Sequence, residues 1–491
     1  MSDHRTLLAG TAANVVGLAA GVLAAFGVQV LLGRSLPAGG LGVVTVAVQI
    51  AFVAAAGGRF GMDMTAIRRV AMAEGGTGDR ASMRSLVERA AAIGAAASVV
   101  LAILVAAGAE LIGRYSTPVA IGSASIPLMA VATIYLGATR GLKSMKPTLW
   151  IYWIGQPVAW IGIAAAAIAA GGGINAAVAA YAVSWGLAAI AARIWWRAMS
   201  GGMGDARATR EQVVDAIRYG LPRAPSALLA QALFWGDLFV LGHYVQGREL
   251  DSYAAAGRIS QVLLLFLTSV SLIFSPFAAD LHARGEIDHL NRLFKDATRW
   301  SLAATLPVLV VLLVAAPQAL DAFGPNYGSG VRPLRIMLAG QLVNVATGSV
   351  AYVLVMIGRT GLDLVDNVLA NVVLIGGAAV LASSYGPTGA AIASAVALSG
   401  VNVVRVVQVR EVARIHPFSR TQLRLALPTG ACLAAALAVH ALMSGGTWWA
   451  SLTLTTLAAG AAYCLLLFPG LPAHERRAVR GRLRPADRQA P

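Results

Sequence analysis

Charged residues are scarce in this chain of 491 residues: they make up 12% of it, while 58% of the residues are apolar. A water-soluble protein carries about twice that charged fraction. A soluble protein of this length would lack the polar surface needed to cover its domains, and a disordered chain would contain far fewer apolar residues. The composition therefore excludes both classes and leaves a polytopic membrane protein.

The sequence also lacks the motifs of common catalytic sites. It contains no His-Glu-x-x-His zinc motif, no Gly-x-Ser-x-Gly nucleophile turn and no Walker phosphate loop. Its two cysteines, Cys432 and Cys464, lie in apolar stretches without metal-ligand spacing. We therefore expect a protein that is not an enzyme, with no cofactor, no cysteine metal site and no disulfide. ATP-driven transport by this chain alone is not expected either.

Long apolar runs dominate the chain instead. Because a membrane helix needs about 20 mostly apolar residues, we predict about fourteen spans, divided where Gly and Pro mark turns. The first is read as an uncleaved helix rather than a signal peptide. The predicted spans cover roughly residues 12–32, 42–58, 90–110, 119–138, 150–170, 174–192, 223–245, 253–278, 299–320, 333–357, 365–384, 388–408, 424–443 and 447–468.

Basic residues are distributed unevenly along these spans. The chain has 38 Lys and Arg against 22 Asp and Glu, a net charge of +16. With the N-terminus inside, only six of the 38 belong to the outer side: Arg34, Arg114, Arg248, Arg258, Arg332 and Arg335. Since Lys and Arg are retained on the cytoplasmic side, both termini are predicted to be cytoplasmic. The cations are then topology determinants, and no nucleic-acid partner is expected.

The connections between spans differ on the two sides. No outer loop exceeds about a dozen residues, which leaves no room for a catalytic domain there. Two inner connections are amphipathic. Thr209–Gln212 has capping-box spacing, and residues 286–300 place Leu290 and Phe294 on one helix face. Both segments are predicted to be helices that lie on the inner membrane surface.

Two parts of the chain resemble each other. A shift of 209 residues aligns Leu32-Gly33 with Leu241-Gly242 and places Gln49 on Arg258. The offset spans six predicted helices, an even number, so the two halves share one orientation. We expect two pseudo-symmetric six-helix bundles and two additional helices. The predicted division is residues 1–200, residues 201–415, and residues 416–491, which hold the additional helices and a basic cytoplasmic tail.

Small residues recur every four positions in the first predicted helix, at Ala13, Gly17, Gly21, Ala25 and Gly33, with Gln29 between the last two. This spacing favours close approach of a second helix. The alternative is a smooth wall for a passing lipid tail.

Several segments of the chain resemble one family of membrane proteins. They are residues 32–42 (LGRSLPAGGLG), 234–237 (FWGD), 252–255 (SYAA), 323–327 (FGPNY) and 385–391 (YGPTGAA). The segments resemble the polysaccharide flippases of the Wzx type, in the multidrug/oligosaccharidyl-lipid/polysaccharide exporter superfamily.

This resemblance implies a V-shaped pair of six-helix bundles in the bacterial cytoplasmic (inner) membrane. Such a protein moves an isoprenoid-diphosphate-linked oligosaccharide from the inner to the outer leaflet by alternating access, for cell-surface polysaccharide synthesis. The implied partners are this lipid-linked oligosaccharide, the phospholipid bilayer, and the polymerase and export proteins of the pathway. A monomer is expected.

Polar residues inside the predicted spans are the first candidates for binding. Asp237 is the acid deepest within a span, and Arg258 on the following span lies at a similar depth. An Asp237–Arg258 pair would either hold two helices together or take part in substrate or ion coupling. Asn367 and Asn371 share a helix face and, with Asp237, form a candidate cation site; polar helix packing is the alternative.

Arginines near helix ends complete the candidate site. Arg34, Arg59 and Arg223 either extend to the membrane surface or line a cationic cleft together with Arg258. Since Arg binds phosphate oxygens bidentately, such a cleft would match the charge of a diphosphate. Arg59 and Arg223 would meet it on the inner side, and Arg34 and Arg258 on the outer. Gln49 is the remaining candidate substrate-binding residue.

Other functions stay open at this point. A cation-coupled exporter of cationic drugs from the same superfamily would present carboxylates in its cleft, and the first and tenth predicted spans contain none. A polymerase or ligase of the same pathway would need a large outer loop with carboxylates or histidines, which is also missing. A non-transporting scaffold is the last alternative. An acidic cleft would favour the drug exporter.

Overall fold

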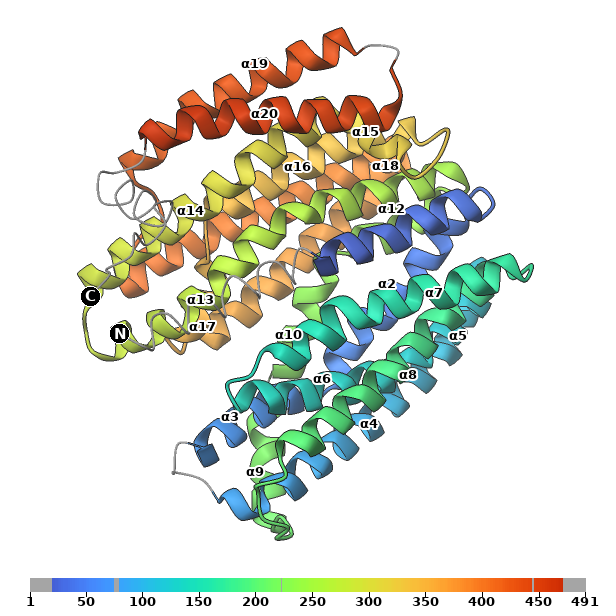
Figure 1. Ribbon diagram of the computed structural model, residues 1–491. Helices are drawn as coiled ribbons and strands as arrows, with labels where there is room; N and C mark the ends of the chain where they lie inside the picture. Colours follow the sequence, from blue (N-terminus) through green and yellow to red (C-terminus); the bar gives the residue numbers. More distant parts are fainter. Residues whose placement is uncertain (1–19, 75–78, 222, 444–445, 471–491) are drawn as a thin grey trace, which may run out of the picture.

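The computed structural model describes residues 20–74, 79–221, 223–443 and 446–470, and these form helices and turns without a β-strand (Figure 1). Nine helices in this part of the chain are long and apolar enough to cross a membrane, or eleven if each bent helix pair is one span. The all-α, multi-pass class is therefore confirmed.

Two of these long helices are broken by glycine. The helical run Arg80–Gly141 has non-helical backbone at Gly113, and α18 (Thr360–Ala413) has it at Gly386, where φ is +54°. The two parts of α18 fold back on each other, because residues 42 positions apart are hydrogen-bonded. Since the first helix is described only from Ala20, the number fourteen stays a prediction.

The first group of helices follows the predicted spans closely. Within this group α6 packs against α4 and α8, and α2 packs against α5. The elements are the first helix (Ala20–Ser35), α2 (Gly40–Gly58), α3 (Met62–Glu74), η1 (Arg80–Ser82), α4 (Met83–Gly108), η2 (Ala109–Tyr115), α5 (Ser116–Ser123), α6 (Ser125–Gly141), the π-helical η3 (Thr148–Gly155), α7 (Gln156–Ala169) and α8 (Ile174–Met199).

The second group is more interrupted. Short breaks divide several predicted spans, and α16 and α11 pack against α18. The elements are α9 (Arg210–Gly220), α10 (Arg223–Ala232), α11 (Gly236–Tyr244), α12 (Arg248–Ser260), η4 (Gln261–Leu263), α13 (Leu264–Ala283), α14 (Ile287–Val314), α15 (Ala316–Asp321), η5 (Gly328–Gly330), α16 (Val331–Ala346), α17 (Val350–Met356) and α18.

The last two helices form an antiparallel pair against the second group. After η6 (Arg420–Leu425), helices α19 (Ala426–Leu442) and α20 (Trp448–Gly470) pack on each other and on α14. Cys432 is buried in this contact and Cys464 is exposed, and both are free thiols.

The outer surface of the helices is apolar. On α4, Val99, Val100, Ile103 and Leu104 are all exposed and recur with helical spacing on one face. An exposed stripe of this kind is stable in lipid and not in water. The chain is accordingly a multi-pass membrane protein.

The two groups of helices meet along α2, which contacts both α12 and α10 of the second group. The contact of α2 with α12 lies near the right-hand side of Figure 1, and the groups diverge towards the left. The first helix contacts the second group across this boundary. The ring of Phe26 meets the ring of Phe323 edge-on, with 5.2 Å between the ring centres. Its small residues do permit close approach: a Cβ on Gly21 would lie 2.5 Å from the backbone oxygen of Trp153.

One of the two amphipathic segments differs from the prediction. The capping box at Thr209 and Gln212 is present and opens α9. The segment 286–300, however, is not a separate surface helix. It is the first half of α14, and Leu290 and Phe294 are buried in a core with α13 and α17. The apolar face found in the sequence packs on protein, because α14 continues without a break into its membrane-spanning part.

Candidate functional site

A cavity of about 380 Å³ lies between the two groups of helices. The first helix, α2, η3, α7 and α8 line one side, and α10, α12, η4 and α13 line the other. Its volume falls within the range of about 300–1,000 Å³ that is typical of small-ligand sites. Figure 1 shows α2 and α12 at the boundary between the two groups.

Arg258 is the charged residue of this cavity. Among the described residues that line it, no other side chain carries a charge. The guanidinium carbon lies 4.9 Å from the centre of the Trp235 ring, and the buried Nε has no hydrogen-bond partner. Arg258 comes ten residues after Arg248, about 15 Å along α12 at 1.5 Å per residue. The site therefore holds one positive charge inside the apolar helical run Arg248–Ser271.

Gln49 lies in the same cavity, on α2, and is buried. The internal repeat aligned Gln49 with Arg258, and the structure brings both positions to one cavity from opposite sides. Four further glutamines line the cavity, and the sequence analysis did not select them: Gln29, Gln156, Gln231 and Gln261. The signal that would have found them is an amide side chain inside an apolar span.

Neither Arg34 nor Arg59 lines the cavity. Arg34 donates from Nε to the carbonyl of Ala322 at 2.7 Å, at the end of the first helix. Arg59 forms an ion pair of 3.2 Å with Asp63, one turn along the chain. Arg223 opens α10, but its side chain lies outside the described residues. Of the candidate arginines whose side chains are described, Arg258 lines the cavity, whereas Arg34 and Arg59 are held by nearer acceptors.

The predicted Asp237–Arg258 pair is wrong. Asp237 accepts a hydrogen bond of 2.6 Å from the hydroxyl of Tyr253 and one of 2.9 Å from the amide of Leu238. It lines an adjoining small pocket that includes Gln341 and shares Trp235 and Gln261 with the cavity, whose own lining does not include Asp237. The prediction assumed one straight helix over 223–245. The chain instead bends by 51° between α10 and α11, which turns Asp237 away from the cavity.

The predicted cation site is not assembled either. Asn371 donates to the carbonyl of Leu229 at 2.9 Å, and the side-chain oxygen of Asn367 accepts from Arg405 at 3.0 Å. Arg405 also pairs with Asp363 at 2.9 Å. The polar residues on this face of α18 thus neutralise and hydrogen-bond the buried guanidinium of Arg405. Asp237 lies in another pocket. In the part of the chain that is described, no group of three His, Cys, Asp or Glu residues is arranged to hold a metal.

The two groups of helices are joined at the end where Arg34 lies, here called the Arg34 end. Asp251 on α12 is fully buried and accepts from the backbone amides of Gly39 and Gly42, both at 2.7 Å. Gly39 precedes α2, has φ of +91°, and offers no side chain to cap that helix. Asp251 therefore caps α2 from the other group, where a carboxylate is favoured by the helix dipole.

Two tyrosines make matching contacts at the same end. The hydroxyl of Tyr115 donates to the carbonyl of Gly242 at 2.8 Å, and that of Tyr327 donates to the carbonyl of Gly33 at 3.2 Å. Each bond crosses from one group of helices to the other. Gly33 and Gly242 are the residues that the 209-residue shift aligned. The Arg34 end is thus closed by reciprocal contacts together with Asp251.

Comparison with known proteins places the chain in a family. The family described as "Polysaccharide biosynthesis protein" matches residues 7–277, more than half of the sequence. The chain belongs to this family. A second family, MatE, matches residues 222–380. Among curated proteins, the probable low-salt glycan biosynthesis flippase Agl15 of Haloferax volcanii is 25% identical over 179 residues, which are 35% of this chain. The match spans 36% of the length of that relative.

Solved structures share the fold of this member of the polysaccharide biosynthesis protein family. The lipid II flippase MurJ in an inward closed conformation has a TM-score of 0.72 at 14% identity, over 96% of this chain and 99% of that one. A multidrug resistance MATE family transporter gives 0.63 at 14% in its inward-facing form, over 80% of this chain and 94% of that one. The outward-facing conformation of a multidrug resistance MATE family transporter has a TM-score of 0.59 at 16% identity, over 82% of this chain and 95% of that one. The resemblance to the flippases of this superfamily is confirmed for family and fold.

The contacts of Asp237 in this family member lead to a prediction about stability. We expect the losses caused by Asp237→Ala and Arg258→Ala to add in the double variant, with no rescue, because the two side chains are not paired. Asp237→Asn and Tyr253→Phe should instead show a coupling energy of about 1 kcal/mol, since they share a hydrogen bond. Thermal unfolding of the purified protein in detergent measures both cycles. Partial recovery in the Asp237/Arg258 double variant would contradict the assignment.

Proposed function

We propose that the protein moves an isoprenoid-diphosphate-linked oligosaccharide from the inner to the outer leaflet by alternating access, for cell-surface polysaccharide synthesis. The observation that carries this proposal is the charge of the central cavity, in which Arg258 is accompanied by amides and aromatic rings but by no described carboxylate. A diphosphate cannot cross about 30 Å of hydrocarbon without a compensating charge. Arg258 supplies that charge at the depth where it is needed.

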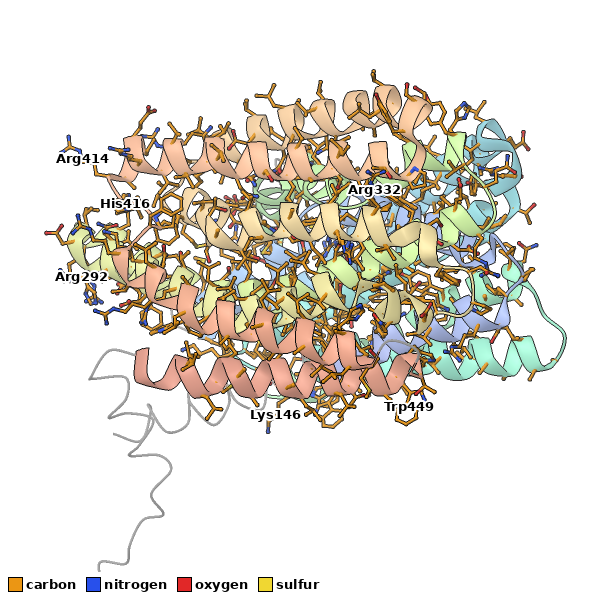
Figure 2. All side chains as sticks on the ribbon, turned by 90° about the horizontal axis from the view of Figure 1, so that it is seen from above. Lys146, Arg292, Arg332, Arg414, His416 and Trp449 are labelled. Carbon is orange, nitrogen blue, oxygen red and sulfur yellow. The ribbon has the colours of Figure 1, made fainter. Side chains whose placement is uncertain are left out.

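The direction of access follows from the proposed topology. We take both termini to be cytoplasmic, in the bacterial inner membrane, because most cations then lie inside. Figure 2 shows Arg292, Arg414 and His416 together at one end of the molecule, away from Trp449. With this topology the Arg34 end is the outer end. The contacts of Asp251, Tyr115 and Tyr327 then close the cavity on the outside, and transport requires that they break.

The division of the chain into moving parts is also a proposal. The two bundles would be residues 1–200 and 201–415, with residues 416–491 attached to the second. The contacts of α19 and α20 with α14 support this attachment. The contacts that must break and reform in each cycle are then those of α2 with α12 and with α10.

A cation-coupled drug exporter is the second candidate. The MatE match and the MATE transporter structures favour it, since they share the fold. A pocket for cationic drugs would be expected to contain carboxylates, because opposite charges attract. The described lining of the cavity contains none. The charge of the cavity therefore favours the anionic lipid over the cationic drug.

The two candidates are separated by transport in proteoliposomes. One set of vesicles contains undecaprenyl diphosphate that carries a fluorophore-labelled glycan, and external dithionite bleaches the molecules of the outer leaflet. A second set contains ethidium as a cationic drug. The proposal predicts that the purified protein makes nearly all of the labelled lipid accessible to dithionite and leaves ethidium retention unchanged. Movement of ethidium without movement of the lipid would overturn it.

A further inference from the structure

One side of the central cavity is built from five aromatic rings that touch in sequence. Tyr152 contacts Trp153 at 5.1 Å and Trp185 at 5.6 Å, measured between ring centres. Tyr181 contacts Trp185 at 6.2 Å and Trp160 at 4.7 Å. All these contacts are edge-on, an arrangement that aromatic pairs prefer. These five residues, here called the aromatic wall, all line the cavity and all come from the first group of helices.

The position of the wall is fixed by the backbone. Tyr152 and Trp153 belong to η3, a π-helical segment, which is a rare conformation that often occurs at functional sites. Gly21 of the first helix lies directly against the backbone of Trp153. The indole nitrogen of Trp160 donates to the carbonyl of Ala177 at 3.1 Å. The rings are therefore held in place without a ligand.

Amide side chains surround the aromatic wall. Gln156 lies at the start of α7, next to the wall, and its amide nitrogen donates to the hydroxyl of Ser184 at 3.0 Å. This bond fixes the plane of the amide. With Gln29, Gln49, Gln231 and Gln261, five glutamines line the cavity. An amide offers both a donor and an acceptor, and neighbouring sugar hydroxyls offer the same. A cavity for a lipid tail would need none of these groups.

The charge of the cavity is placed on the side opposite the wall. Arg258 belongs to α12 in the second group, where it packs over the ring of Trp235. Arg258 is the one charge in the described lining. A bound diphosphate therefore pairs with this guanidinium and leaves no positive charge for a second anion. An acidic sugar on the aromatic wall would then lie in a poorly solvated site without a partner, which is costly.

From this arrangement we infer that the aromatic wall binds an uncharged sugar ring next to the diphosphate. The C–H face of the ring packs on Tyr152 and Trp153, its hydroxyls pair with the glutamine amides, and Arg258 holds the phosphate. This inference rests on the proposed function and adds the class of sugar that the carrier accepts. It makes the wall a determinant of specificity that is separate from the phosphate site.

Binding of three defined lipids to the full-length protein in detergent tests the inference. The probes are undecaprenyl diphosphate alone, the same lipid with one N-acetylglucosamine, and the same lipid with one glucuronic acid. The neutral sugar should tighten binding over the sugar-free lipid, and the acidic sugar should not. Trp153→Leu should lower the ratio of the affinity for the neutral-sugar lipid to that for the sugar-free lipid by about tenfold, which corresponds to one aromatic contact. The affinity for the sugar-free lipid itself should not change.

Trp150→Leu is the matched control, because Trp150 belongs to the same π-helical segment but is 56% exposed and does not line the cavity. It should leave all three affinities unchanged. Equal weakening of all probes by Trp153→Leu, or equal affinity of the wild type for neutral and acidic sugars, overturns the assignment of the wall. Failure of the proposed function has a different result, in which no probe binds with or without sugar. Thermal unfolding verifies that each variant is folded.

Discussion

Replacement of Arg258 by glutamine is expected to lower translocation of the diphosphate-linked glycan by about 100-fold, with normal protein levels. Two charge-assisted hydrogen bonds to phosphate are worth together about 3 kcal/mol, which corresponds to that factor. Arg258→Lys retains the charge but not the planar fork, so it should keep part of the activity. The dithionite assay in proteoliposomes measures all three proteins.

Arg335→Gln is the control for this experiment. Arg335 is an exposed arginine of α16 that donates to the carbonyl of Leu313 and does not line the cavity. Its replacement should leave transport unchanged. If Arg258→Gln transports at the wild-type rate, the central cation is not needed for the cargo and the proposed mechanism is wrong. If the control also fails, the loss reflects positive charge in general rather than this position.

Replacement of Asp251 by alanine is expected to open the Arg34 end. The change removes two buried hydrogen bonds and leaves α2 without its cap, a loss of about 3 kcal/mol or more that falls on the closed form alone. The ratio of closed to open molecules should fall by about 100-fold. Spin labels at Ala38 and Gln246, exposed positions beside Gly39 and Gly247, report the change as a longer distance distribution.

Transport by Asp251→Ala should fall as well, because a carrier that remains open on one side returns slowly to the other. Glu249→Ala is the matched control, since Glu249 is an exposed acid in the same turn of α12. It should keep both the wild-type distances and the wild-type rate. Unchanged distances in a folded Asp251→Ala protein would show that the buried carboxylate does not hold this end closed.

Much of the architecture was predictable from local sequence. The spans follow from about 20-residue apolar runs, since a helix in lipid must satisfy its own backbone. The breaks at Gly113 and Gly386 lie where turn residues separate the runs. The repeat led to Gln49, which lines the same cavity as Arg258. Such features depend on residues close in sequence or on a pattern that occurs twice.

The partners of the polar side chains were harder to predict. Asp237 was predicted to pair with Arg258 because the two residues lie at similar depth along straight helices. The chain bends before α11, and Asp237 instead accepts a hydrogen bond from Tyr253. Asn367 was predicted to bind a cation. Its side-chain oxygen instead accepts a hydrogen bond from Arg405, 38 residues further along the chain. A partner depends on the direction of a side chain around the helix, and a small bend changes that direction completely.

The sequence by itself determined the all-α membrane class and the family, because these depend on composition, run length and local motifs. Only the tertiary structure decided that Arg258 meets the cavity while Arg34 and Arg59 do not, that five aromatic rings face it, and that Asp251 caps a helix more than 200 residues away in the chain. The physical reason is that long apolar runs in lipid must form helices, which satisfy their own backbone hydrogen bonds. Which faces of those helices meet depends on bends, breaks and packing between residues distant in sequence.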